Sequence, residues 1–171
     1  MSRKNKEYGR RIRLTPEEEA LILNHRRTSN VGIIGDTHEP FCHPEYRNFC
    51  YEVFNRFGCT EIVHIGYECD NAALSYHESE LEMPNAVREA EQAQKAMEKW
   101  YKTFPDVKVC VGNHSALPFR QATTAGIPKR YLKTYEEIWN APEGWSWKME
   151  WEIDNVLYVH GTGSSGQSGA R

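Results

Sequence analysis

The apolar residues of the chain gather in short runs, and three of these runs end at a glycine. Runs of four or five apolar residues bounded by glycine are typical of strands buried on both faces of a sheet. The pattern therefore predicts strands at residues 31–34, 61–65 and 107–111, which are followed by Gly35, Gly66 and Gly112.

Around these runs, apolar residues recur every three or four positions, which is the spacing of one helical face. The spacing predicts helices at residues 44–56 and 85–104. The core faces of these two helices are expected to carry Tyr46, Phe49, Cys50, Val53 and either Phe54 or Phe57, and Val87, Ala90, Ala93, Met97, Trp100, Tyr101 and Phe104. A further helix is predicted at residues 15–25, because Thr15-Pro16-Glu17-Glu18 supplies a capping hydroxyl, a proline in the first turn and acids near the positive end. Strands alternating with helices predict the α/β class, with a parallel sheet covered by helices.

The last third of the chain has a different pattern. Residues 116–146 are rich in proline, glycine and basic residues, so we expect an irregular region with a short helical piece near 131–140. Residues 147–153 and 156–160 then have the character of two strands around Asp154-Asn155. This dipeptide turns tightly, and the pattern predicts a β-hairpin.

Length, charge and cysteine content narrow the class of protein. A chain of 171 residues favours one domain, which we expect at residues 15–171 after a basic, flexible leader at residues 1–14. The net charge of −3 gives no nucleic-acid signature over the whole chain. No apolar stretch is long enough to span a membrane. Five cysteines without paired spacing indicate a reducing, cytoplasmic setting.

Polar residues follow the predicted strands at the point where each one ends. They are Asp36, His38, Tyr67, Asp70, Asn113, His114 and, after the hairpin, His160. Taken singly, each could belong to a capped turn or a surface loop. Because the carboxyl ends of parallel strands meet at one edge of a sheet, we expect the group to converge there. Carboxylate, imidazole and amide ligands suit a first-row metal ion.

The same residues form ordered blocks, namely Gly35-Asp36-Thr37-His38, Gly66-Tyr67-Glu68-Cys69-Asp70, Gly112-Asn113-His114-Ser115 and His160-Gly161. These blocks resemble the signature of the calcineurin-like metallophosphoesterase superfamily. In that family, G-D-x-H, G-D-x-x-D, G-N-H-[DE] and a further histidine precede a final G-H-x-H. The resemblance runs from about residue 30 to the last residue. It is strongest to small members found in phage and bacterial genomes.

The resemblance implies a fold and a cofactor. The fold is a four-layer α/β/β/α sandwich, and the cofactor is a pair of divalent metal ions, which manganese, iron or zinc would suit. By position, Asp36 and His38 would ligate the first metal. Asn113 and His160 would ligate the second, and position 67 would bridge the two.

The resemblance also implies a reaction. A metal-activated hydroxide would hydrolyse a phosphomonoester or a phosphodiester, and nucleic acid is included among the substrates considered. His114 would stabilise or protonate the leaving oxygen, and Asp70 would orient His114.

Two departures from the family pattern bear on activity. Tyr67 stands where the family has a bridging aspartate, and a phenol must lose a proton before it can bind metal as an anion. A strong Lewis acid such as ferric iron would favour that loss, whereas divalent metals would weaken the pair. The chain also reaches Arg171 before any G-H-x-H, so we expect the sandwich to be incomplete at its C-terminal side. Ser115 stands where the family's third block has an acid, which also argues against a complete site.

Other functions stay open at this point. A catalytically impaired relative that acts as a binding module would retain the blocks without a complete metal site. Nucleic-acid binding without chemistry would use the basic leader together with Lys129, Arg130 and Lys133, although such residues are usually part of a solvated face. The sequence names neither the substrate nor the oligomeric state.

Overall fold

The computed structural model describes residues 15–17, 29–75 and 85–161 of the chain. The predicted leader and most of the predicted helix at 15–25 lie outside the described residues. None of the described helices has the length and apolar surface that a bilayer-spanning helix needs.

Four parallel strands form the main sheet, in the spatial order in which they occur along the chain. They are β1 (Val31–Ile34), β2 (Glu61–His64), β3 (Val107–Cys110) and β4 (Trp145–Lys148). The register pairs Ile34 with His64 and His64 with Val109, so the strands end nearly level. The carboxyl ends of the strands therefore lie at one edge, as the α/β class requires.

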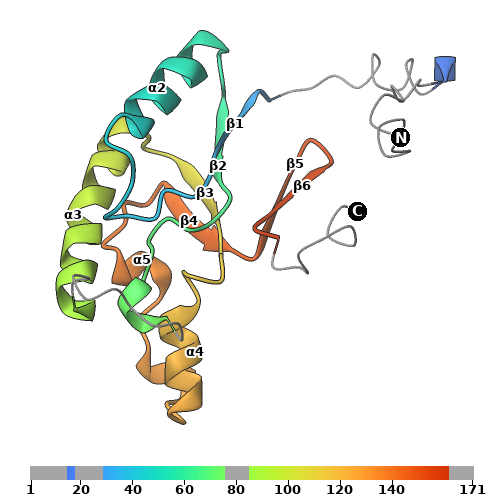
Figure 1. The fold of residues 1–171 in the computed structure, drawn as a ribbon. Helices are drawn as coiled ribbons and strands as arrows, with labels where there is room; N and C mark the ends of the chain where they lie inside the picture. Colours follow the sequence, from blue (N-terminus) through green and yellow to red (C-terminus); the bar gives the residue numbers. More distant parts are fainter. Residues whose placement is uncertain (1–14, 18–28, 76–84, 162–171) are drawn as a thin grey trace, which may run out of the picture.

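Helices α2 (Tyr46–Arg56) and α3 (Ala86–Thr103) run along one face of this sheet (Figure 1). Right-handed crossovers between neighbouring parallel strands place successive helices on the same side. Between these layers lies the aromatic core, which includes Trp100, Phe104, Trp145 and Trp147. The Trp145 indole donates to the Phe104 carbonyl at 2.7 Å, so it satisfies its only polar group within the core.

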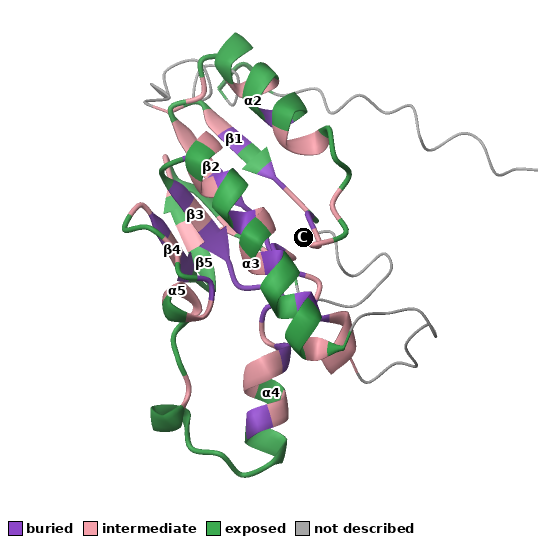
Figure 2. Ribbon diagram, turned by 90° about the vertical axis from the view of Figure 1, so that its left-hand side faces the viewer, coloured by how far each residue is buried: buried purple, intermediate pink, exposed green. Residues whose placement is uncertain are grey.

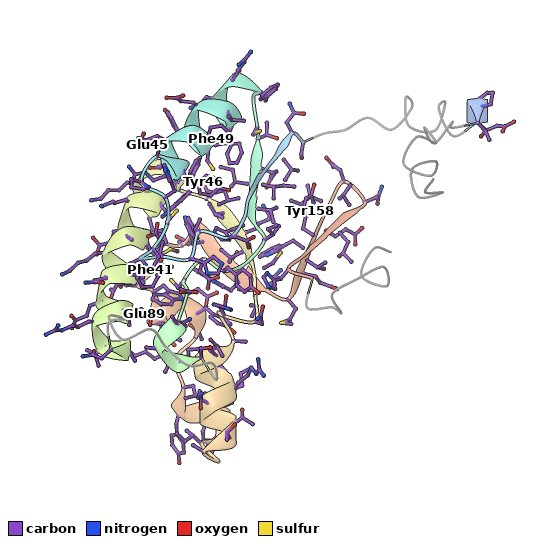
Figure 3. All side chains as sticks on the ribbon, in the orientation of Figure 1. Phe41, Glu45, Tyr46, Phe49, Glu89 and Tyr158 are labelled. Atoms are coloured by element: carbon purple, nitrogen blue, oxygen red, sulfur yellow. The ribbon has the colours of Figure 1, made fainter. Side chains whose placement is uncertain are left out.

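Both helices were predicted, but parts of their core faces were predicted wrongly. In α2, Cys50 is buried, and of the two alternatives Phe54 packs against the core while Phe57, just after the helix, is 65% exposed. Phe49, which was predicted on the core face, is 60% exposed. Gly32 of β1 makes room for Phe54, since a Cβ at Gly32 would lie 2.9 Å from that ring. Figure 3 shows Tyr46 and Phe49 on α2, on the opposite side of the sheet from Tyr158.

In α3, the first turn does not face the sheet as predicted. Val87 is 68% exposed and Ala90 is exposed, while Glu89 is buried. The Glu89 carboxylate accepts hydrogen bonds from the backbone N–H groups of Ala72 and Ala73, at 2.7 and 2.9 Å. Those groups begin the 3₁₀ helix η1 (Ala72–Leu74) and need acceptors, so the polar side of α3 turns inward here. The exposed and buried sides of α3 are visible in Figure 2.

The region predicted to be irregular contains the helix α4 (Leu117–Thr124), followed by η2 (Lys129–Tyr131) and α5 (Tyr135–Ile138). The short piece predicted near 131–140 corresponds to α5, which begins with a capping box between Thr134 and Glu137. Helix α4 was missed because it buries only Leu117 and Ala122, which gives too weak a helical spacing of apolar residues.

The predicted strand 147–153 is two strands. Its first part belongs to β4, which pairs in parallel with β3, and its second part is β5 (Glu150–Ile153). β5 pairs antiparallel with β6 (Val156–Val159), which confirms the hairpin. Its turn residues, Asp154 and Asn155, have φ of 51° and 62°, as a primed turn requires.

The hairpin lies against the sheet on the side away from α2 and α3 (Figure 1). The Trp151 indole donates to the Val109 carbonyl at 3.0 Å, and Lys148 lies 4.3 Å from the centre of the Trp151 ring. Cys110 contacts the Tyr158 carbonyl at 3.4 Å. These contacts fix the end of β6, and His160 follows it directly.

Candidate metal centre

The loops after β1, β2 and β3 and the residue after β6 meet at the carboxyl edge of the sheet. Tyr67 lies in the middle of this group. Its ring centroid is 4.7 Å from that of His38, 4.5 Å from His114 and 4.3 Å from His160. Three imidazoles from three different segments therefore surround one phenol ring.

Backbone hydrogen bonds join the first two loops. The N–H of His38 donates to the Tyr67 carbonyl at 2.7 Å, and that of Glu39 donates to the Glu68 carbonyl at 3.1 Å. His38 and Tyr67 both have left-handed φ values, 46° and 57°. Residues other than glycine, asparagine and aspartate seldom adopt this conformation, and strained backbone of this kind clusters at functional sites.

The protonation of the imidazoles follows from their partners. His114 Nδ1 lies 2.6 Å from the Asp70 carbonyl oxygen, and His160 Nδ1 lies 2.7 Å from the Ile65 carbonyl oxygen. Carbonyl oxygens only accept, so both Nδ1 atoms carry protons. His38 Nδ1 lies 2.7 Å from Asp70 Oδ1, and a carboxylate favours the same tautomer. In their neutral forms all three imidazoles thus keep the lone pair on Nε2, the arrangement typical of metal-ligating histidines.

The contact between His160 and Asn113 is informative. His160 Nε2 lies 2.9 Å from Asn113 Oδ1. With Nδ1 protonated, a neutral His160 presents an acceptor to another acceptor. A cation bound by both atoms would satisfy this pair, as would a protonated imidazole or an amide turned to present Nδ2. The residue types and the geometry therefore fit a bound cation.

Asp70 is central to the other half of the site. Its Oδ1 lies 2.7 Å from His38 Nδ1 and 3.0 Å from His114 Nδ1. Potential ligand atoms of these three residues all lie within 4.8 Å of one another. The sequence analysis assigned Asp70 to His114 alone, and the structure adds its contact with His38.

Asp36 is placed differently from the other expected residues. It lies in the tight turn after β1 with φ of 50° and is exposed. It is not part of the group formed by His38, Asp70 and His114. Asp36 belongs to the same loop as His38. Its assignment as a metal ligand stays a prediction.

Two buried residues that the sequence analysis did not single out hold the loops together. His64 is fully buried, and its Nδ1 accepts from the Gly66 N–H at 3.2 Å. Its Nε2 therefore carries the proton and donates to Thr37 Oγ1 at 3.0 Å. The Thr37 hydroxyl donates in turn to the Glu68 carbonyl at 3.0 Å. Desolvation lowers the pKa of His64 to about 3, so His64 is neutral at physiological pH.

Glu68 is the second of these residues. Its fully buried carboxylate accepts from Ser115 Oγ at 2.6 Å and from Trp147 Nε1 at 3.1 Å. Burial raises its pKa, while these hydrogen bonds lower it by less. Glu68 thus ties the His114 loop to β4. The sequence did contain a signal for these two residues, because His64 and Glu68 are polar residues on an otherwise buried strand-and-turn segment.

The glycines of the motifs make room for His160. A Cβ on Gly66, whose φ is +104°, would lie 2.3 Å from His160 Nδ1. A Cβ on Gly112 would lie 3.0 Å from His160 Cε1. Both positions therefore need glycine for reasons of space, and Gly66 also needs it for its backbone conformation.

Replacing Gly66 with alanine is expected to displace His160 and to lower the free energy of unfolding by about 2–4 kcal/mol. Denaturant unfolding measures the loss, and the histidine ring signals in NMR report the displacement. Gly58→Ala is the matched control: its φ is +60°, but nothing lies within 4 Å of its Cβ position. It should cost only about 1 kcal/mol. Equal losses in the two variants would contradict the steric argument.

Comparisons with protein-family models, with curated proteins and with solved structures find no match to this chain.

Proposed function

We propose that the chain is a metal-dependent phosphoesterase, which hydrolyses phosphomonoester or phosphodiester bonds. One observation carries the proposal: three imidazoles with Nε2 as their remaining ligand atom surround position 67, at the edge of a parallel sheet where α/β enzymes bind ligands. Bound there, the two metal ions (manganese, iron or zinc) would supply Lewis-acid stabilisation of the phosphoryl oxygens and a water of lowered pKa.

The residues would divide their work as follows. His38 would hold one metal through Nε2, with Asp36 reaching it from the same loop. His160 and Asn113 would hold the other, because their facing acceptor atoms suit a shared cation. Position 67 would lie between the two.

His114 and Asp70 would act on the substrate. His114 directs its Nδ1–H to the Asp70 carbonyl, so its Nε2 is left to face the leaving oxygen. In its doubly protonated form it could transfer a proton from Nε2 to that oxygen. Asp70 would hold the ring in this orientation through its Oδ1, 3.0 Å from Nδ1.

The proposal includes membership of the calcineurin-like metallophosphoesterase superfamily and its four-layer α/β/β/α sandwich. The β5–β6 hairpin, which lies on the face of the main sheet opposite the helices, would be part of the second sheet. The five cysteines are free thiols, which supports a reducing, cytoplasmic setting.

A second candidate is a catalytically impaired relative that binds phosphate esters, nucleic acid included. Tyr67 favours it, because a half-buried phenol stands where a bridging carboxylate would neutralise two cations. This candidate predicts little tightly bound metal, whereas the first predicts close to two ions per chain.

The proposed function is tested by metal analysis together with hydrolysis of nitrophenyl phosphate and bis-nitrophenyl phosphate in added manganese. Asp36→Asn is expected to lower the hydrolysis rate by about 100-fold, because an amide replaces an anionic ligand. Glu91→Gln, the same change at an exposed position of α3, should leave the rate unchanged. An unchanged rate in the Asp36 variant would exclude the assignment.

A further inference from the structure

A groove opens between α4, η2, α5 and the end of β4. Its volume is about 680 Å³. Three aromatic side chains line it. Phe119 and Tyr135 have ring centroids 4.7 Å apart, and Tyr135 lies nearly parallel to Trp147, at 16° and 6.4 Å. Phe119 and Tyr135 are half-buried and Trp147 is buried, and an aromatic lining of this kind suits a flat, apolar ligand group.

The charged residues of the groove are mostly basic. Lys129, Lys133 and Lys148 line it, and the first two are exposed and make no ion pair with any described residue. The groove contains one acid, Glu136, whose Oε1 accepts from the Trp147 N–H at 3.3 Å. Three lysines against one engaged carboxylate favour an anionic ligand.

The groove and the candidate metal centre are built on neighbouring segments of the chain. Helix α4 begins directly after the His114 loop, and Phe119 lies in its first turns. Trp147 lines the groove, and its Nε1 donates to the buried Glu68, which also accepts from Ser115 of the His114 loop. The N–H of Val111 donates to the Lys148 carbonyl at 2.8 Å, just before the loop that carries Asn113. The walls of the groove are therefore joined through α4 and β4 to the loop that carries Asn113 and His114.

We propose that this groove binds a nucleotide unit, with the base against Phe119, Tyr135 and Trp147 and a phosphate on Lys129 and Lys133. The proposal rests on the proposed function in one respect, that the bond to be cleaved would lie at the candidate metal centre. It names the substrate class as a nucleotide, free or within a single strand. An aromatic wall and lysine side chains are the usual means of binding single strands.

Binding is measured without metal, in the presence of a chelator, so the result does not depend on catalysis. The probes are adenosine 5′-monophosphate, by calorimetry, and a fluorescein-labelled twelve-residue oligothymidylate, by anisotropy. Lys129→Ala/Lys133→Ala is expected to weaken binding of both by about tenfold and to lower the salt dependence for the strand by about 1.4 in logarithmic slope. The matched control, Lys95→Ala/Lys102→Ala on α3, removes the same charge from exposed positions and should change affinity less than twofold.

A second variant tests the aromatic wall. Phe119→Leu keeps an apolar side chain, and loss of base stacking is expected to weaken oligothymidylate binding by about fivefold or more. An abasic strand of equal length should bind weakly and should not distinguish this variant from the native protein. Thermal unfolding checks that each variant folds.

Tighter binding of the strand than of the mononucleotide would identify a single strand as the natural ligand, and the reverse would identify a free nucleotide. Absence of binding to both probes overturns the proposal. So does equal weakening of binding by Lys129→Ala/Lys133→Ala and by its control, or an abasic strand that binds as tightly as the oligothymidylate. Hydrolysis of nitrophenyl phosphate, which carries no base, tests the metal centre separately. If nitrophenyl phosphate is hydrolysed but neither probe binds, the groove proposal has failed. If the probes bind but nitrophenyl phosphate is not hydrolysed, the proposed function has failed.

Discussion

Replacing Tyr67 with aspartate is expected to raise the affinity for manganese by about 10- to 100-fold and to increase phosphoesterase activity with it. The phenol ring lies within 4.7 Å of the ring centres of all three imidazoles, so a carboxylate at this position would face both halves of the site. A carboxylate is ionised at neutral pH, whereas a phenol with an ordinary pKa near 10 is not.

The backbone favours this replacement. Tyr67 has φ of 57°, a conformation that aspartate and asparagine adopt more readily than tyrosine. Tyr67→Asn is therefore the control, because it relieves the same backbone strain and opens the same space without adding charge. Metal content of the purified proteins and calorimetric titration with manganese give the comparison. If the Asp and Asn variants bind manganese equally, position 67 does not bridge two ions.

Replacing His64 with glutamine is expected to lower the free energy of unfolding by about 2–4 kcal/mol at pH 7, because two buried hydrogen bonds lose their geometry. His64 accepts from the Gly66 N–H and donates to Thr37, and it thereby holds the first and second loops together. Its replacement should also weaken metal binding, since His38 and Tyr67 belong to those loops.

The effect of His64 should depend on pH in one direction. Burial lowers its pKa to about 3, from 6.5 in the unfolded chain. Between these values the unfolded state binds a proton that the folded state does not, so the contribution of His64 to stability falls as pH decreases, by about 1.4 kcal/mol per unit. The difference in stability between native protein and variant should narrow below pH 6.5.

Urea unfolding at several pH values measures this difference. The buried Glu39 and Glu68 have raised pKa values and affect stability in the opposite direction, but they are present in both proteins. Their contributions therefore cancel in the comparison. A difference that stays constant between pH 7 and pH 5 would show that folding does not lower the pKa of His64.

The arrangement of the site could largely be predicted from the sequence, because parallel strands deliver the residues that follow them to one edge. His38, Tyr67, Asp70, Asn113, His114 and His160 each contact another member of the group in the structure. The tautomers could not be predicted, because they depend on which carbonyl each Nδ1 meets. The role of Asp70 between two imidazoles likewise depends on side-chain positions.

The errors in the fold have a common cause, which is that a periodic pattern does not show which neighbour an element will have. The run from Trp147 to Ile153 has alternating character throughout, but a parallel partner takes its first part and an antiparallel partner the rest. Glu89 interrupts an apolar face because η1 lies opposite it. Both outcomes depend on tertiary contacts that outweigh local pattern.

The position of His160 at the end of β6 has a thermodynamic consequence. This candidate ligand comes from a separate two-stranded sheet, which is joined to the main sheet through Trp151 and Cys110. A cation held by His160 and Asn113 would connect the two sheets, so docking of the hairpin and affinity for the cation are reciprocally linked. Any substitution that loosens the packing of Trp151 on β3 would then weaken binding of that cation from a distance.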